Sequence, residues 1–96
     1  MLQQVTVSAE TPISLKPLLR AAIQSEIKML SFGINRTRER LTAFEKQFDM
    51  NSEEFERRFT ARDLNESLDF IEWEGEIKTL RLLEEQQAVL QQAHLS

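Results

Sequence analysis

A heptad repeat of apolar residues constrains this chain more than any other feature of its sequence. Apolar side chains recur four and three residues apart through the first half, which places them on one face of a helix. That helix would begin near residues 14–17, where Ser14 can cap it and Pro17 fits the first turn. At 1.5 Å per residue, a helix of about 35 residues is roughly 50 Å long. We interpret this face as a seam for oligomer formation, made of Ile23, Ile27, Leu30, Ile34, Thr37, Leu41, Phe44 and Phe48.

A turn and a short corner helix are predicted directly after the seam. Asn51 can cap a new helix, and Glu54, three residues later, can reach back to the cap. Met50, just before the cap, can pack on Phe55 as a hydrophobic staple. These features predict a short helix over residues 52–60 at which the chain reverses direction.

The last predicted helix is capped by Asp63, with Glu66 at the third helical position, and it runs toward Ala93. Its apolar residues form two stripes, and one neighbouring helix can cover only one of them fully. We therefore predict a second covering surface, in the corner helix or in another subunit, and a chain that is not a monomer. One stripe is Leu64, Leu68, Ile71, Gly75, Thr79, Leu82, Gln86 and Val89, and the other is Phe70, Trp73, Ile77, Leu80, Leu83 and Leu90.

Each long helix contains one glycine, Gly33 in the first and Gly75 in the last. A glycine inside a helix costs about 1 kcal/mol relative to alanine. We therefore interpret Gly33 as a point where another backbone comes close, with a kink as the alternative. The two glycines could meet where the helices cross, although no sequence feature fixes that pairing.

The whole chain is predicted to be all-α. Its 96 residues include two glycines and two prolines, which leaves few places to turn and favours long helices over strands. Val5 and Val7 alternate with polar residues, which indicates a short strand or extended arm that frays or pairs with a copy of itself or a partner's edge strand. We expect an arm at 1–13 and a hairpin domain at 14–96, with two long antiparallel helices assembled as a helical bundle.

Composition and charge limit the possible environments and partners. The chain has no cysteine, which excludes a disulfide frame, a thiolate zinc cluster and a cysteine nucleophile. It has no apolar run of membrane-spanning length and no signal-peptide pattern at its start, so we expect a cytoplasmic protein without a membrane partner. The net charge of −4 gives no overall attraction to nucleic acid. Acidic residues concentrate in the second half and basic ones in the first, which favours antiparallel packing of the halves.

Catalysis needs a convergent set of groups, and the sequence offers none. The one histidine, His94, is two residues from the end and is interpreted as a solvated tail residue. Asp69, Glu72 and Glu76 share a helical face, but without histidine they are interpreted as a hydrated face rather than a metal site. We predict no catalytic, metal or cofactor site, and therefore a protein that is not an enzyme.

Two groups of residues have a structural and a functional interpretation. Arg36, Arg38 and Arg40 are interpreted as partners of the acidic last helix in preference to a nucleic-acid contact. Trp73 beside Phe70 is either an exposed anchor for a protein partner or a core residue, and the sequence does not decide between them.

Two segments, FEKQFDMNSEEF at 44–55 and DFIEWEGE at 69–76, carry a family resemblance that extends over residues 25–85. The chain resembles a family of small prokaryotic helical proteins, many of them antitoxins encoded beside a small toxin of the TumE type. The resemblance implies a protein that neutralises a toxin by binding it, without a catalytic signature. It implies that the contact residues are Asp69, Phe70, Glu72, Trp73 and Glu76.

The chain departs from the antitoxins that bind their own operator. Its N-terminal arm lacks the fuller ribbon–helix–helix or helix–turn–helix signature. Three hypotheses therefore remain: an antitoxin for a small protein toxin, a homo-oligomeric helical-bundle scaffold, and a nucleic-acid-binding regulator that uses the arginine face together with the Val5 and Val7 arm.

Overall fold

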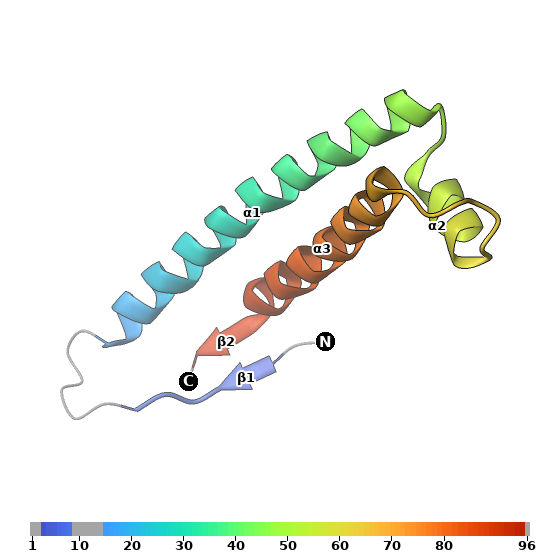
Figure 1. The fold of residues 1–96 in the computed structure, drawn as a ribbon. Coiled ribbons are helices and arrows are strands. Elements are labelled where there is room, and N and C mark those ends of the chain that lie inside the picture. Colours follow the sequence, from blue (N-terminus) through green and yellow to red (C-terminus); the bar gives the residue numbers. More distant parts are fainter. Residues whose placement is uncertain (1–2, 9–14, 96) are drawn as a thin grey trace.

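Two long helices packed side by side form most of the molecule. The computed structural model describes residues 3–8 and 15–95, and within them the chain forms three helices and two short strands. The molecule is elongated, measuring 58 × 22 × 18 Å. The short helix lies at one end of the two long helices, and the two strands lie at the other end (Figure 1). The helices are α1 (Leu15–Phe48), α2 (Ser52–Thr60) and α3 (Leu68–Gln91). The prediction of a mostly helical chain with two long packed helices is confirmed.

The heptad seam of α1 lies against α3 of the same chain. Every seam residue is at least half-buried, and the most deeply buried are Leu30, Ile34, Thr37 and Leu41. In the second half of α1, the half-buried Phe44 and Phe48 pack on the core that α3 helps to form. The interpretation of the seam as an oligomer surface is therefore corrected: its apolar side chains are covered within one chain.

Polar contacts show how α1 and α3 are aligned. Gln87, near the end of α3, donates to the Ser31 hydroxyl in the middle of α1 at 2.6 Å, while Arg40, further along α1, donates to Glu76 in the first half of α3 at 3.0 Å. Residue numbers therefore rise along one helix as they fall along the other. The two long helices run in opposite directions because only the short segment that contains α2 connects them.

The two glycines of the long helices do not meet. A Cβ built on Gly33 would lie 3.3 Å from Cδ1 of Leu83, whereas a Cβ on Gly75 would have nothing within 4 Å. Gly33 thus allows close approach of a leucine side chain rather than of another backbone. Helix α1 continues through Gly33 without interruption (Figure 1).

The cap predicted for α2 is present. Asn51 has an extended backbone, and its side-chain oxygen accepts a hydrogen bond of 2.8 Å from the Glu54 amide. The chain reverses just before it, where Asp49 has a φ of 50°. The Glu54 carboxylate accepts a hydrogen bond from Arg58, one turn further along α2, at 3.0 Å.

The predicted start of the last helix is wrong by four residues, because the cap is Ser67 and not Asp63. Helix α3 begins at Leu68, and the Ser67 hydroxyl caps it by accepting a 3.1 Å hydrogen bond from the Phe70 amide. The Asp63 amide instead donates to the Arg58 carbonyl at 2.9 Å, which completes the end of α2. Arg62, with a φ of 59°, has the left-handed conformation common after a helix end. Asp63 therefore belongs to the connection.

The N-terminal arm pairs inside its own chain. Strand β1 (Gln3–Val5) runs parallel to strand β2 (Ala93–Leu95), with Gln3 opposite Ala93 and Val5 opposite Leu95. The predicted pairing with a copy or a partner strand is replaced by this contact, and α3 ends at Gln91 rather than at Ala93. The predicted cap Ser14, the boundary at residues 13 and 14 and the side chain of His94 lie outside what the structure describes.

Candidate protein-binding surface

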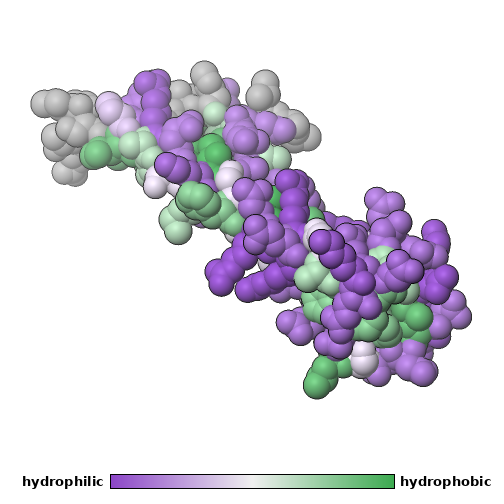
Figure 2. Space-filling model, turned by 90° about the horizontal axis from the view of Figure 1, so that it is seen from above, coloured by the Kyte–Doolittle hydropathy of each residue, from purple (hydrophilic) through white to green (hydrophobic). Residues whose placement is uncertain are grey.

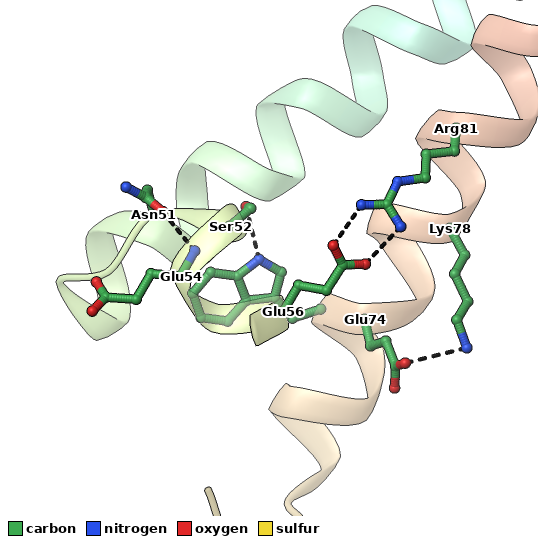
Figure 3. Close-up of polar contacts among 8 residues, drawn as sticks. Asn51, Ser52, Glu54, Glu56, Glu74, Lys78 and Arg81 are labelled. Carbon is green, nitrogen blue, oxygen red and sulfur yellow. Dashed lines mark hydrogen bonds and ion pairs between the residues drawn. The ribbon is translucent and has the colours of Figure 1, made fainter. Parts of the chain in front are cut away.

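An aromatic cluster fixes the position of the acidic segment 69–76. Phe55 of α2 and Trp73 of α3 are both 0% exposed, and their rings stack with centroids 3.9 Å apart and planes 2° from parallel. Phe44 and Phe48 of α1 stack on the same indole. The indole N–H donates to the Ser52 hydroxyl at 3.0 Å (Figure 3), so its one polar atom is satisfied. This cluster joins all three helices.

Trp73 and Phe70 are core residues in this structure. Trp73 has no exposed surface, and Phe70 is half-buried with its ring 5.0 Å from that of Phe48 and 5.4 Å from that of Phe55. The alternative of Trp73 as an exposed anchor is therefore corrected. The decisive factor is α2, which covers a side chain that a two-helix pair would have left at its edge.

Glu76 is also committed to a contact within the chain. Its side chain is 14% exposed, and one oxygen accepts a 3.0 Å hydrogen bond from Arg40 of α1, while its other oxygen is buried without a partner. Arg38 forms a second ion pair between the helices, to Glu84 at 3.0 Å. The interpretation that these arginines pair with the acidic last helix is thereby confirmed for Arg38 and Arg40.

Two of the five predicted contact residues remain on the surface. Asp69 and Glu72 are exposed, and within residues 3–8 and 15–95 neither carboxylate has a side-chain partner. We call these two residues the carboxylate face. Glu72 also borders a hollow of about 400 Å³ on the side of α1, lined by Arg40, Ala43, Phe44 and Gln47. The hollow places an aromatic wall beside an unpaired charge.

A further ion pair joins α2 to α3 and has no counterpart in the sequence-based predictions. Arg81 and Glu56 make two parallel hydrogen bonds, one of them 2.6 Å long (Figure 3). The hydrogen bond from Arg81 lowers the pKa of Glu56 below its ordinary value of 4.5, and the charges of Arg81 and Lys78 act in the same direction, while burial opposes them. The two residues are 25 apart in sequence, so no helical periodicity links them.

A row of exposed apolar side chains runs along one side of α3. These residues belong to one of the two stripes predicted for this helix, and the other stripe is the buried one. Figure 2 shows hydrophobic groups reaching an otherwise largely hydrophilic surface at several points along the molecule. We define the outer stripe as Leu68, Ile71, Gly75, Leu82 and Val89, in which the exposed fractions of the four apolar side chains are 85%, 52%, 53% and 43%.

The outer stripe continues into a shallow apolar groove between the long helices. The groove has a volume of about 430 Å³, and its apolar walls are Leu30, Leu82, Val89 and Leu90. Glu26 and Glu85 stand at its rim. Such grooves receive side chains of a protein partner more readily than small polar ligands.

The described part of the chain contains neither a metal-binding cluster nor a membrane-spanning helix. Among residues 3–8 and 15–95, no group of three or more histidine, aspartate or glutamate side chains is arranged to hold a metal ion. None of the helices described is both long and apolar enough to cross a membrane. Comparison of the chain with protein-family models, with curated proteins and with solved structures gives no match.

Proposed function

We propose that this chain is a non-catalytic protein-binding module that neutralises a small protein toxin, as its resemblance to small helical antitoxins implies. The observation that supports this most directly is the carboxylate face, where Asp69 and Glu72 are exposed and unpaired in the described part of the chain. Carboxylates of this kind complement a basic nuclease or nucleotidyltransferase site, in which they take the place of phosphate groups.

The surroundings of the carboxylate face suit a rigid binding surface. The start of α3 is held by the Ser67 cap, and one turn further on Trp73 is locked in the aromatic cluster. Side chains on such a support lose little freedom on binding, which favours affinity. The role of Trp73 in this proposal is therefore to position Asp69 and Glu72, and the hollow beside Glu72 is available for a side chain of the toxin.

The test uses the small protein encoded next to this chain as the probe. We expect Glu72→Lys to weaken its binding about a hundredfold or more, because a lysine would repel a basic site. Glu39→Lys is the matched control: Glu39 is an exposed residue of α1, the charge change is identical, and binding should stay within about threefold of wild type. Titration calorimetry measures both, and circular dichroism confirms that both variants are folded.

The possible failures of this test are distinguishable. If the neighbouring product does not bind the wild-type chain, the antitoxin function is wrong. If it binds but tolerates both Glu72→Lys and Asp69→Lys, the function stands and the carboxylate face is not the inhibitory surface. If Glu39→Lys weakens binding as much as Glu72→Lys, only the net charge of the chain matters.

A homo-oligomeric scaffold is the second candidate, and the exposed outer stripe favours it. An apolar row of this length on one helix is typical of a surface that another helix covers. The nucleic-acid-binding alternative has less support, because Arg38 and Arg40 are engaged by Glu84 and Glu76 and would have to leave these partners to contact phosphate.

A further inference from the structure

We propose that the hollow beside Glu72 receives an arginine side chain of the protein partner, whose guanidinium pairs with Glu72 and stacks on the ring of Phe44. The hollow lies between α1 and α3, next to the carboxylate face, and has a volume of about 400 Å³. This inference rests on the proposed function, since the partner is the same small toxin, and it names the chemical group that the toxin presents to this site.

The charges around the hollow select a cation as its occupant. Arg40 lines the hollow, but it donates to Glu76 at 3.0 Å, so its charge is already balanced within the chain. Glu72 lines the hollow too, and in the described part of the chain its exposed carboxylate has no side-chain partner. Asp69, three residues earlier on the same face of α3, adds a second exposed negative charge. A cation would be attracted here, whereas a phosphate or a carboxylate would be repelled by Glu72.

The aromatic wall selects arginine among the cations. The indole of Trp73 stacks on Phe44, with ring centroids 5.6 Å apart and planes 8° from parallel, and the part of Phe44 that it leaves uncovered lines the hollow. A guanidinium is planar and weakly hydrated, so it stacks on an aromatic ring while its fork donates two parallel hydrogen bonds to a carboxylate. A lysine ammonium is a strongly hydrated point charge and lacks this planar fork.

The α1 side of the hollow provides space and a further acceptor. Arg40, Ala43 and Gln47 follow each other at intervals of three and four residues, so they share one side of the helix. The methyl group of Ala43 keeps the middle of this row low, and a longer side chain there would fill the hollow. The exposed side-chain amide of Gln47 offers an oxygen to the remaining N–H groups of the guanidinium.

The first test measures the hollow without the toxin. N-acetyl-arginine amide is titrated into the full chain, and the nuclear magnetic resonance signals of Ala43, Glu72 and the Gln47 side-chain amide should shift. For a ligand of this size we expect a dissociation constant on the order of 1–10 mM. N-acetyl-lysine amide carries the same charge and should bind about threefold more weakly or worse, because it cannot stack and pair at once.

A matched pair of variants tests the role of the carboxylate. Glu72→Gln keeps the size of the side chain and should weaken binding of N-acetyl-arginine amide about tenfold or more. Glu39→Gln is the control, because Glu39 is exposed on α1 and does not line the hollow, and binding should be unchanged. Circular dichroism should show both variants folded.

The second test uses the small protein encoded next to this chain. Ala43→Met fills the hollow without changing the charge, and methionine is a good helix former, so the variant should fold and bind this protein about tenfold more weakly. Ala22→Met is the control: Ala22 is exposed on α1 away from the hollow, and its variant should bind as wild type does. Titration calorimetry measures both.

The outcomes separate this inference from the proposed function. Equal binding of the arginine and lysine derivatives, or full arginine binding by Glu72→Gln, would overturn the arginine site. If the neighbouring protein binds wild type but tolerates Ala43→Met, the antitoxin function stands and the docking of an arginine in the hollow is wrong. If that protein does not bind wild type at all, the proposed function fails, and the titration with the two derivatives decides the arginine site by itself.

Discussion

The two ends of the helical hairpin differ in how completely the apolar residues between the helices are enclosed, although Leu68 and Ile71 are exposed on the outer side of the corner end as well. At the corner end, where α2 packs, the buried residues Leu41, Phe55, Trp73 and Ile77 form one cluster that draws on all three helices. At the open end, among the residues that the structure describes, α1 and α3 pack on each other without a third helix, and the two short strands lie beside them (Figure 1). There Leu30 is 8% exposed, but Leu18, Met29, Phe32, Leu82 and Val89 are between 43% and 65% exposed.

This difference shows what a third element contributes to a pair of helices. Two helices bury one face of each, and a residue such as Trp73 becomes fully enclosed only where α2 closes the side of the pair. The polar bonds of Gln87 to Ser31 and to the Ile27 carbonyl lie in the interface of the open end, where the corner end has stacked rings. We therefore expect the corner end to hold most of the stability and the open end to depend on a covering partner.

The largest predicted effect is the loss of the indole at the corner. Trp73→Ala should lower the free energy of unfolding by about 3–5 kcal/mol, because it empties a fully buried site and leaves Ser52 without its donor. Leu83→Ala, at a half-buried site of the open end, should cost only about 1–2 kcal/mol. Urea unfolding followed by circular dichroism measures both. Equal losses would refute the contrast between the ends.

A smaller effect concerns the cap that starts the corner helix. Asn51→Ala should cost about 1 kcal/mol, because the Glu54 amide loses the acceptor that lies 2.8 Å away. Asn35→Ala is the control, since Asn35 is exposed inside α1 and alanine favours a helix there. Thermal melts of the two variants should move in opposite directions. A neutral Asn51→Ala would mean that α2 is held by its aromatic contacts alone.

The third prediction asks how tightly the open end is packed. Gly33→Ala should stabilise the protein by less than the roughly 1 kcal/mol that alanine gives at an unobstructed helix position. The added Cβ would lie 3.3 Å from Cδ1 of Leu83, a flexible side-chain end that a loosely packed region allows to move. A lower melting temperature for Gly33→Ala would instead show that the open end is as rigid as the corner.

The smallest effect is the acid dependence of the ion pair between α2 and α3. Because Arg81 lowers the pKa of Glu56, the pair stabilises the folded state above the ordinary pKa of 4.5 and loses this contribution as the pH falls through the lowered value. Glu56→Gln should therefore reduce the urea midpoint slightly at pH 7, and the difference from wild type should vanish at strongly acidic pH. The side chain of Arg81 is 59% exposed and that of Glu56 is 27% exposed, so added salt should shrink the difference as well.

Local features of this fold follow from the sequence, and distant ones do not. The Asn51 cap was predictable because the side chain and the amide it binds are three residues apart. The seam and the two stripes of α3 were predictable from helical periodicity. The start of α3 was not predictable, because Asp63 and Ser67 both have side chains that can cap a helix. With the left-handed turn at Arg62, Asp63 belongs to the connection and Ser67 is the residue that caps α3.

The binding surface was predictable only in part for the same reason. The acidic segment and its place at the start of α3 are visible in the sequence, but the exposure of each residue depends on α2 and α1. Trp73 is enclosed by Phe55, and Glu76 forms an ion pair with Arg40. Asp69 and Glu72 are the predicted contact residues that remain exposed. Contacts over long separations, such as Arg81 with Glu56, have no periodic signal at all.

The parallel pairing of β1 with β2 has a mechanical consequence. Because Gln3 lies opposite Ala93 and Val5 opposite Leu95, the outward ends of the two strands are at opposite ends of the pair. Tension that pulls the chain from both sides makes the strands slide past each other, so their hydrogen bonds are loaded together in shear rather than peeled apart in turn. All three helices lie within the loop that this pair closes. A pulling force therefore reaches the hairpin only after the strands have separated, and the pair acts as its mechanical latch.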